Sequence, residues 1–578
     1  MRKVCQNCKT DFTIEPEDAS FYVKIDVSPP TLCPDCRYRR RLMDRNEWNL
    51  YRRKCDATGE SIVSIYRPEA PFPVYHKEYW HGNGWDPMQY GRDCDFDRPF
   101  FEQYAELRRV VPHMSLVSPS SVNSEYANQS QELKDCYMVS ASGDTEKCMY
   151  GNWYEHSYLC GDCYMMDKGE LCYECINCAR CYACTWSEDC FDCSNVHFST
   201  ACQGCQNCFG SANLRNKNHC WFNEQLNKEE YEKRLAAFDW SRTAIAEARA
   251  KAAELALKTP RKYFHGTKAY ESTGDYLENT KEAKLNFNCR ESKETAYLQD
   301  SWVVTDSLDI TEILSVERSY EVQGCAYIRN SMVIRSSGSL NECFYCDMCE
   351  ASSNLFGCFG VQHKEYCILN KQYSKEEYLA LKAKIVAHMK ATGEWGEYFP
   401  PEQSPFAYNE SVAQDFFPLT EAKAKARGLA WYTASEKDYK PTIIAAELPA
   451  TIAPVGDDIL NQVIRCATQD SEADKVTHPL CATAFRLIPL ELDLYRKLGI
   501  PIPDKCAPCR RTDRFAKRNP RRLFRRHCDC AGFGKGGYAN QSSHSHDSAA
   551  CTNEFETSYA PGRLEIIYCE QCYNSEVV

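Results

Sequence analysis

Fifteen cysteines in the middle of the chain share a single phase, because every spacing between them is a multiple of three residues. They are Cys136, Cys148, Cys160, Cys163, Cys172, Cys175, Cys178, Cys181, Cys184, Cys190, Cys193, Cys202, Cys205, Cys208 and Cys220. A β-strand repeats every two residues and an α-helix every 3.6, so neither element alone produces this pattern. It predicts a backbone that turns one residue of every triplet towards a common interior.

A longer repeat of twelve residues contains the triplets, and Cys136, Cys148 and Cys160 begin one column with that spacing. From Cys289 to Cys358, all 24 positions of the phase are Cys, Ser, Thr, Val, Ile or Leu. Period three within twelve is typical of a narrow β-solenoid with four triplets per coil, whose interior admits only small side chains. The coil resembles the twelve-residue coils of insect antifreeze proteins, but it lacks their outward Thr rows, so ice binding is not expected.

The central thiols allow three interpretations. Cysteine packs as a small hydrophobe, so these residues can simply fill the interior. The run from Cys172 to Cys184 is close to an iron–sulfur ligand spacing, but it lacks the three-residue gap and the proline that usually end such a run. Disulfides or additional metal sites are the remaining alternatives. Because the same phase continues elsewhere as Ser, Val and Ile, we favour packing and do not expect an iron–sulfur cluster.

Two CxxC pairs near the N-terminus have the spacing of a zinc ribbon. The four cysteines are Cys5, Cys8, Cys33 and Cys36. Each pair offers two thiolates from a tight turn, and two pairs complete the tetrahedral shell of structural zinc. The basic residues at the N-terminus are not followed by an apolar run, so no export signal is expected, and metal is favoured over disulfides.

The C-terminus repeats this plan, because Cys481 precedes Cys506 by 25 residues, as Cys8 precedes Cys33. The expected ligands of this second site are Cys466, Cys481, Cys506 and Cys509. His478 stands where simple counting would place the first ligand. The choice between Cys466 and His478 stays open, with a slight preference for Cys466.

A third site is predicted further on, because Cys528 follows Cys506 by 22 residues, as Cys55 follows Cys33. Its expected ligands are Cys528, Cys551, Cys569 and Cys572, and Cys530 competes with Cys551 because a Gly-, Ser- and His-rich insertion splits the pair. The aligned N-terminal positions are Cys55, Thr58, His76 and Tyr79. Thr and Tyr are poor zinc ligands, so that site is expected to be degenerate. The complete sites predict about three zinc ions per chain.

These end segments carry a family resemblance. The N-terminal pattern CxxC…F…FY…PPxxCPxCR is similar to a small family of bacterial zinc ribbons, and the YxPxxPxxVYCxxCY pattern is similar to a second ribbon type. The order of parts looks like an uncharacterised bacterial family in which zinc ribbons flank Cys-rich twelve-residue repeats. The resemblance implies no activity. Relatives sometimes carry a CoA-transferase label, and no residue pattern in this chain supports it.

Basic segments follow both CPxC pairs. Residues 37–54 carry a net charge of +6 and residues 505–527 one of +9, so the rest of a chain with net charge −12 carries −27. Candidate nucleic-acid-binding residues are Arg39, Arg40, Arg41, Arg510, Arg514, Arg518, Arg521 and Arg525. The last five fall on one helical face, although Pro520 is expected to kink or end the helix. Arg rows bind phosphate through paired contacts, so RNA is one hypothesis, and pairing with the acidic body or a solvated face is the alternative.

The predicted fold class is mainly β with helical caps, with two narrow β-solenoids between the terminal zinc-ribbon modules. The expected divisions are an N-terminal tandem ribbon module (1–82), a connector (83–122), solenoid 1 (123–222), a helical cap and linker (223–284), solenoid 2 (285–370), a helix and irregular linker (371–460) and a C-terminal tandem ribbon module (461–578). Each solenoid leads into a helix, for which Asn227 and Ser374 are the expected N-caps.

No catalytic pattern is found, since the sequence lacks GxSxG, a P-loop and a strand followed by GxGxxG. We therefore expect a non-enzymatic, zinc-binding scaffold or interaction protein that is cytoplasmic, has no membrane span and binds protein partners. The first alternative is an RNA- or ribosome-associated factor that uses the Arg-rich segments. The second is a redox or metal-handling protein that uses the central thiols.

Overall fold

The computed structural model describes residues 1–433, 439–530, 538–546 and 551–577. The chain forms two compact units. Unit 1 consists of Met1–Val117, Phe264–Thr433 and Arg521–Leu523, and unit 2 of Ser118–Tyr263, Ala434–Pro520 and Phe524–Val578. Unit 1 therefore joins the N-terminal cysteine pairs to the second repeat region, and unit 2 joins the C-terminal pairs to the first.

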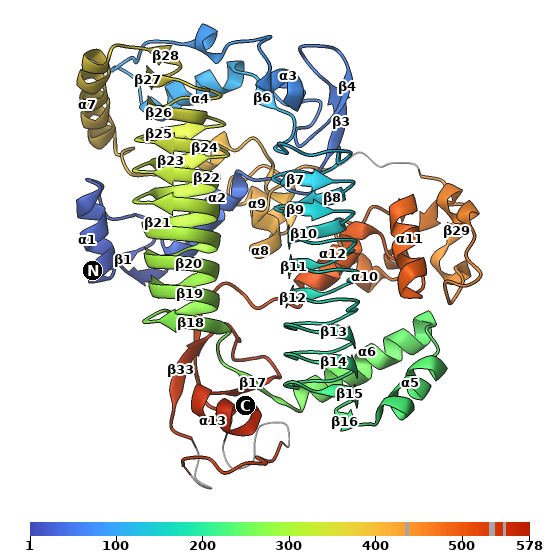
Figure 1. The fold of residues 1–578 in the computed structure, drawn as a ribbon. Coiled ribbons are helices and arrows are strands. Elements are labelled where there is room, and N and C mark those ends of the chain that lie inside the picture. The colour runs from blue at the N-terminus through green and yellow to red at the C-terminus, as the bar shows by residue number, and fades with distance from the viewer. Residues whose placement is uncertain (434–438, 531–537, 547–550, 578) are drawn as a thin grey trace. The chain divides into compact units, whose positions relative to one another are not determined.

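The first repeat region, from Val122 to Gln225, is a stack of short parallel strands that we call ladder 1 (Figure 1). Paired residues lie twelve positions apart, as Tyr137 and Met149 do, and isolated bridges with the same offset fill the intervals between strands. The strands are β7 (Gln131–Lys134), β8 (Tyr137–Ser140), β9 (Gly143–Glu146), β10 (Met149–Glu155), β11 (Tyr164–Asp167), β12 (Ile176–Ala179), β13 (Ser194–His197), β14 (Gln206–Phe209), β15 (Asn218–Trp221) and β16 (Glu224–Gln225).

The second repeat region, from Gly266 to Gln372, forms ladder 2, with longer strands and the same offset of twelve in nearly all its parallel pairings. Its strands are β18 (Gly266–Tyr270), β19 (Gly274–Lys284), β20 (Asn286–Ala296), β21 (Gln299–Glu317), β22 (Tyr320–Arg329), β23 (Met332–Arg335), β24 (Gly338–Asn341), β25 (Phe344–Asp347), β26 (Glu350–Phe356), β27 (Glu365–Ile368) and β28 (Lys371–Gln372). Pairing begins at Gly266, earlier than the expected start at residue 285.

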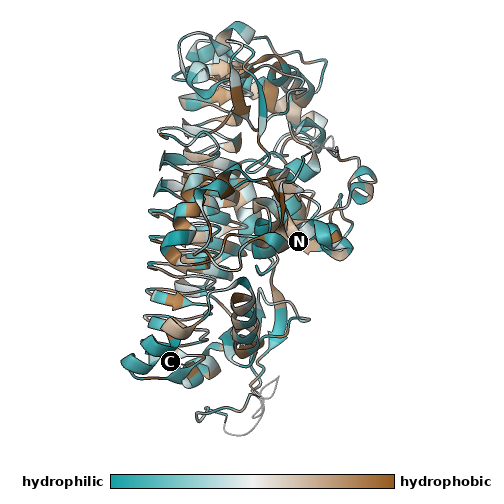
Figure 2. Cartoon of the chain, turned by 90° about the vertical axis from the view of Figure 1, so that its right-hand side faces the viewer, coloured by the Kyte–Doolittle hydropathy of each residue, from teal (hydrophilic) through white to brown (hydrophobic). Residues whose placement is uncertain are grey.

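In both ladders the parallel sheet closes around a buried interior, which gives it a barrel-like form. The cysteines of the predicted phase make up most of the ladder 1 core, and apolar residues join cysteines in ladder 2. Figure 2 shows hydrophilic residues interspersed with apolar ones along the stacked strands, as one inward residue per triplet requires.

The residue before nearly every inward position adopts a left-handed backbone conformation. In ladder 1, Asp135, Asn177, Asp189, Asn195 and Asn207 have φ angles of 49° to 54°. This region costs most L-residues about 1–2 kcal/mol, but Asn and Asp enter it more readily. The repeated left-handed residue turns the chain at every triplet and so produces the period of three.

Each ladder ends in the same way. The last parallel strand pairs with a short antiparallel strand, β16 in ladder 1 and β28 in ladder 2. A helix follows, α5 (Lys228–Ala237) or α7 (Lys375–Thr392). Both N-cap predictions are confirmed, because Asn227 Oδ1 accepts a hydrogen bond from Glu230 N at 2.8 Å and Ser374 forms a full capping box with Glu377. The antiparallel turn and the helix terminate the parallel stack.

The remaining elements of unit 1 surround ladder 2. Those before it are β1 (Arg2–Val4), β2 (Asp11–Thr13), α1 (Pro16–Lys24), α2 (Pro34–Met43), β3 (Tyr51–Lys54), β4 (Ser61–Ser64), β5 (Val74–Tyr75), α3 (Lys77–His81), η1 (Pro87–Tyr90), α4 (Phe100–Val110) and β6 (His113–Met114). Those after it are η2 (Pro401–Gln403), η3 (Tyr408–Glu410), α8 (Ala413–Phe416) and α9 (Glu421–Lys425). Proline at the first helical position starts α1 and α2, where its missing N–H costs nothing.

The remaining elements of unit 2 belong to the C-terminal module and its connections. They are α6 (Arg242–Leu257), β17 (Pro260–Lys262), β29 (Ile443–Ile444), η4 (Ala445–Glu447), η5 (Asp457–Asn461), β30 (Ile464–Arg465), η6 (Ala467–Asp470), α10 (Glu472–Thr477), β31 (Ala484–Phe485), α11 (Pro489–Leu498), α12 (Ala507–Phe515), β32 (Phe524–His527), β33 (Glu554–Thr557), β34 (Ile566–Tyr568) and α13 (Glu570–Val577). Within the ranges given above, no helix combines the length and the apolar character needed to span a bilayer.

Candidate metal centres

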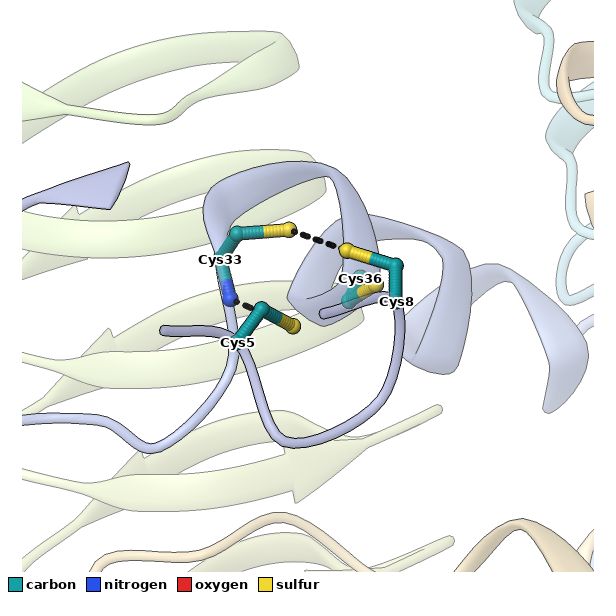
Figure 3. Close-up of side chains that lie close together, drawn as sticks. All are labelled: Cys5, Cys8, Cys33 and Cys36. Carbon is teal, nitrogen blue, oxygen red and sulfur yellow. Dashed lines mark hydrogen bonds between the residues drawn. The ribbon is translucent and has the colours of Figure 1, made fainter. Parts of the chain in front are cut away.

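The four N-terminal cysteines meet at one point (Figure 3). The thiol sulfurs of Cys5, Cys8, Cys33 and Cys36 all lie within 4.8 Å of one another, and Cys8 Sγ is 3.6 Å from Cys33 Sγ. With Zn–S bonds of about 2.3 Å, the sulfurs of a tetrahedral site stand about 3.8 Å apart. The sulfur spacing therefore fits a four-thiolate zinc site.

Local structure places these sulfurs. The β1–β2 hairpin carries Cys5 and Cys8 at its turn, and Cys33 is the residue that caps α2, so Cys36 falls in the first turn of that helix. Cys33 N donates a hydrogen bond to Cys5 Sγ at 3.3 Å, which ties the two pairs together. A hydrogen bond from Cys36 lowers the pKa of Cys33 to about 4, and the same bond raises the pKa of Cys36, so the Cys36 thiol stabilises the Cys33 thiolate.

The first C-terminal cluster repeats this geometry. Its members are Cys466, Cys481, Cys506 and Cys509. Cys466 Sγ lies 3.9 Å from Cys509 Sγ, and Cys506 N donates to Cys466 Sγ at 3.2 Å, as Cys33 N does to Cys5. His478 Nε2 instead lies 2.9 Å from Asp513 Oδ1. Of the two alternatives left open by the sequence, the structure thus brings Cys466 into the cluster.

The second C-terminal cluster joins Cys528, Cys551, Cys569 and Cys572. Cys551 Sγ stands 3.9 Å from Cys569 Sγ and 3.7 Å from Cys572 Sγ. Cys569 N donates to Cys528 Sγ at 3.2 Å, which is the same backbone-to-sulfur bond for a third time. All three clusters are compatible with metal binding, and zinc as the occupant stays a prediction.

The aligned N-terminal positions form no such cluster in the described part of the chain. Cys55 still accepts a backbone hydrogen bond from His76 N at 3.3 Å. Thr58 Oγ1, however, donates to Glu60, and Tyr79 OH donates to Gly84 O. The fold of this ribbon is thus retained while two of its four ligand positions serve other contacts.

The ladder thiols are bound to the backbone of their own ladder. Cys172 Sγ donates to Glu170 O at 3.4 Å and to Cys181 O at 3.5 Å. Ser187 Oγ makes the equivalent bonds to Thr185 O and Val196 O, so Cys and Ser play one role in the interior. Burial raises the pKa of Cys325 to about 12. Across the described ranges no cysteine forms a disulfide and none of the metal-compatible groups includes a ladder cysteine.

The helix after each second CxxC pair docks on a ladder through an identical pair of arginines. On α2, Arg37 Nε donates to Asp309 Oδ2 at 2.8 Å, and Arg41 Nη1 donates to Asp309 Oδ1 at 3.1 Å. The side chains of Arg41 and Asp309 are both fully buried. One carboxylate of ladder 2 therefore receives two guanidinium groups from successive turns of one helix.

Unit 2 contains the same arrangement. Arg510 Nε lies 2.8 Å from Asp162 Oδ2, and Arg514 Nη1 donates to Asp162 Oδ1 at 2.6 Å. Because Arg510 follows Cys509 directly, as Arg37 follows Cys36, the two helices carry their arginine pair at the same distance from the metal ligands. We call this contact, two arginines on one ladder aspartate, the arginine clamp.

Aromatic residues complete both clamps. Tyr297 OH donates to Asp18 Oδ2 at 2.6 Å, and Tyr150 OH donates to Glu491 Oε2 at 3.3 Å. Asp18 and Glu491 stand at matching positions of the two terminal modules.

Two ring contacts also correspond. Tyr22 packs edge-on against Tyr320 at 5.6 Å, and Tyr495 packs edge-on against Tyr173 at 5.4 Å. In each ladder the clamp aspartate thus follows one tyrosine by twelve residues and precedes a second tyrosine by eleven.

These contacts agree with the alternative in which the arginines pair with the acidic body. Arg41, Arg510 and Arg514 are buried in the clamps, Arg40 pairs with Glu321 and Glu397, and Arg521 pairs with Asp300. Arg518 lies over the rings of Phe515 and Tyr164, and Arg39 Nη2 donates to Cys36 Sγ at 3.7 Å. Arg525 is exposed and pairs with Glu554. Because α12 ends at Phe515, the last five arginines do not share one helical face.

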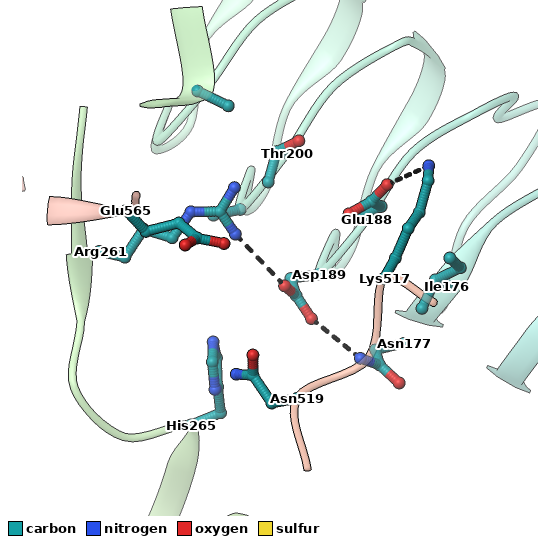
Figure 4. Close-up of polar contacts among 12 residues, drawn as sticks. Ile176, Asn177, Glu188, Asp189, Thr200, Arg261, His265, Lys517, Asn519 and Glu565 are labelled. Atoms are coloured by element: carbon teal, nitrogen blue, oxygen red, sulfur yellow. Dashed lines mark hydrogen bonds and ion pairs between the residues drawn. The ribbon is translucent and has the colours of Figure 1, made fainter. Parts of the chain in front are cut away.

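Further polar contacts hold the C-terminal module on ladder 1 (Figure 4). Arg261, on the strand β17 that pairs with β34, lies 4.0 Å from Asp189, which accepts a hydrogen bond from Asn177. Lys517, just after α12, pairs with Glu188, the residue before Asp189. The module thus contacts neighbouring residues of one coil of ladder 1, and the bond from Asn177 links that coil to the preceding one.

Comparison with protein-family models and with curated proteins finds no match for this chain. The class that the structure supports is a mainly β protein whose two ends carry cysteine clusters that fit zinc-ribbon-like sites.

Proposed function

We propose that this protein is a non-enzymatic, zinc-binding scaffold, in which each of two β-solenoids is rigid and is held by the zinc ribbons of one end of the chain. The arginine clamp, present twice, carries the proposal. In both copies the second CxxC pair and the arginine pair lie on one helix. A metal ion bound at the cysteines would therefore fix the helix that reaches the ladder.

The two ladders support the solenoid interpretation. Their residues pair with an offset of twelve in nearly all parallel pairings, and the inward column is buried and made mostly of small or aliphatic side chains. Each coil contacts only its neighbours, as in other repeat proteins, so a ladder is stiff and offers its outward side chains in regular rows. Tyr158, Tyr182 and Tyr327 are 38%, 48% and 58% exposed. Exposed tyrosines of this kind favour a protein partner.

The proposed zinc ions are structural. Each cluster supplies four thiolates, and a four-coordinate thiolate site leaves no position for a catalytic water. Of the arginines proposed for RNA binding, Arg41, Arg510 and Arg514 are engaged in clamps. Arg40, Arg521 and Arg525 pair with other carboxylates, which weakens that hypothesis. The ladder thiols are buried and hydrogen-bonded, so they do not favour the hypothesis of a redox or metal-handling protein.

The test is the metal content of purified protein, measured by plasma mass spectrometry, with hydrogen exchange of α2 and α12 measured in parallel. We expect about three zinc ions per chain. Cys36→Ser should lose one ion and increase exchange in α2 (Pro34–Met43). Cys94→Ser is the matched control, because Cys94 lies in none of the clusters. An unchanged zinc content in Cys36→Ser would refute the proposal.

The RNA hypothesis has its own test. Arg525 is exposed and Arg39 is half-buried, and neither belongs to a clamp. If RNA binds there, affinity should fall steeply with salt and drop further in an Arg39→Glu/Arg525→Glu variant. Equal affinity of this variant and the wild-type chain would exclude RNA binding through these segments.

A further inference from the structure

A second set of potential metal ligands lies beside the last cysteine cluster. It consists of Cys530, His544, His546 and Cys572, whose ligand atoms also lie within 4.8 Å of one another. Cys530 Sγ is 2.9 Å from His544 Nδ1 and 3.6 Å from His546 Nε2, and His546 Nε2 is 3.3 Å from Cys572 Sγ. Adjacent N and S ligands of tetrahedral zinc stand about 3.6 Å apart, so these distances suit a Cys2His2 site.

A buried carboxylate orients one of the two histidines. His544 Nε2 lies 2.7 Å from Glu576 Oε1, and the side chains of both residues are almost completely buried. Glu576 is itself held by hydrogen bonds from Tyr538 OH, Gln541 N and Ser542 N. A carboxylate on the far nitrogen of a histidine fixes the proton there and leaves the near nitrogen free to bind metal. Here the near nitrogen is Nδ1, which faces Cys530.

Cys572 belongs to both sets. Its sulfur lies 3.7 Å from Cys551 Sγ on one side and 3.3 Å from His546 Nε2 on the other. Cys572 is on α13 and is 1% exposed. A thiolate sulfur has three lone pairs, so it can bind two cations at once. The two cysteines that competed for one position in the sequence, Cys530 and Cys551, thus serve two adjacent sites.

We propose that the C-terminal module binds two divalent zinc-like cations that share the Cys572 thiolate. One ion is held by Cys528, Cys551, Cys569 and Cys572, and the other by Cys530, His544, His546 and Cys572. Five thiolates and two divalent cations leave one net negative charge, against two for a lone four-thiolate site, so the second ion lowers the charge that the module must bury. This inference rests on the proposed function, which already assigns the four-cysteine site to zinc.

Metal content of the full chain tests the inference. The wild-type chain should contain about four zinc ions in place of about three, and a His544→Gln/His546→Gln variant should lose one. His527→Gln is the matched control, since His527 belongs to the same module and is 72% exposed. Glu576→Gln removes no ligand, and loss of an outer-shell partner typically weakens metal binding about 10–100-fold. The Glu576→Gln variant should therefore release one ion to a competing chelator at a lower chelator concentration than the wild-type chain does.

Cobalt substitution gives an independent readout. A shared thiolate couples the electron spins of two Co²⁺ ions, so the electron paramagnetic resonance signal of the module should weaken as the second ion binds. In the double histidine variant the signal should instead keep the intensity of an isolated ion.

The outcomes separate this inference from the proposed function. Three ions in both the wild-type chain and the histidine variant would overturn the shared site and leave the three ribbon sites intact. Three ions in the wild-type chain and two in the variant would mean that a single ion uses the histidines, which also overturns sharing. A chain that binds no zinc would overturn both proposals.

Discussion

Neutralising the ladder aspartate of a clamp should release the helix that docks on it. In Asp309→Asn, the amide keeps one acceptor oxygen but removes the charge that faces Arg37 and Arg41. Breaking one partner of a buried ion pair costs about 3–5 kcal/mol, because the remaining charge is left uncompensated. Arg41 retains Glu321, whose Oε2 lies 2.6 Å from Arg41 Nη1, and Arg37 keeps a hydrogen bond to the neutral carbonyl of Leu32. Because one of the two arginines keeps a charged partner, we expect the lower end of this range, about 3 kcal/mol.

The same substitution in unit 2 should cost about as much. Arg510 keeps Glu491 as a partner at 2.9 Å, and Arg514 keeps a hydrogen bond to the neutral carbonyl of Tyr150. Asp162→Asn therefore leaves one guanidinium of the pair with a neutral partner, as Asp309→Asn does, and we again expect about 3 kcal/mol.

Amide hydrogen exchange, followed by mass spectrometry, measures each clamp separately. A loss of about 3 kcal/mol corresponds to roughly a hundredfold faster exchange in peptides that cover α2, with α12 unchanged, and the converse is expected for Asp162→Asn. Glu317→Gln is the matched control, since Glu317 forms a half-exposed ion pair with Arg329 on the same ladder. Exchange in α2 that stays within threefold of the wild-type rate in Asp309→Asn would refute the reasoning.

Three further predictions concern the metal, the ladder interior and pH. Removal of metal by a chelator should speed amide hydrogen exchange in α2 and α12 before it speeds exchange in the ladder strands. Simultaneous loss of protection in the helices and the ladders would contradict this order. Cys178→Leu should destabilise ladder 1 by about 1–3 kcal/mol through overpacking. Cys178→Ser should cost less, because Ser makes the same interior hydrogen bonds. Urea denaturation measures both free energies of unfolding, and equal losses of stability in the two variants would argue against a tightly packed interior. Burial lowers the pKa of His197 to about 4, so its stabilisation is complete above the unfolded pKa of about 6.5 and is lost as the pH falls towards 4. Relative to His197→Gln, the wild-type chain should lose about 2 kcal/mol between pH 7.5 and pH 5, and identical pH profiles would exclude a buried neutral histidine.

The cysteine phase predicted the buried positions of the first repeat region correctly. Every cysteine from Cys136 to Cys220 is buried, because an interior one residue wide per triplet leaves little choice of side chain. The early start of ladder 2 was missed because its first coils contain no cysteine. Leu277, Thr280 and Ala283 continue the phase there, and all three are buried. A search for small residues in place of cysteines would have found them.

A second signal in the sequence was also overlooked. Asn, Asp and Gly recur just before the inward residue, as Asp135, Asn177 and Gly204 do, and these positions have positive φ. Their preference for the left-handed region indicates where the chain turns. The phase of the inward residue and the residue type before it are thus two independent signs of the same coil.

The role of the arginines could not be predicted from the sequence. A basic helix after a metal site has the same pattern whether it faces phosphate or a buried carboxylate. The deciding partner, Asp309, lies 272 residues from Arg37, and no local feature marks it. The N-terminal cysteine cluster, in contrast, follows from local spacing, because each of its pairs lies within one turn and only the meeting of the two pairs depends on the fold.

The crossed pairing of modules and ladders has a consequence during synthesis. Arg37 leaves the ribosome 272 residues before Asp309, an interval of roughly 15–50 s at typical elongation rates. During that time Asp162, with Tyr150 and Tyr173 around it, is already available and has the same residue pattern as the correct docking surface. An N-terminal ribbon that docked there would have to leave before the C-terminal ribbon could bind. Arg41 donates a hydrogen bond to Thr311 in ladder 2, whereas the residue two positions after Asp162 in ladder 1 is the bulkier Tyr164. We therefore expect the N-terminal ribbon to fit ladder 2 better than ladder 1.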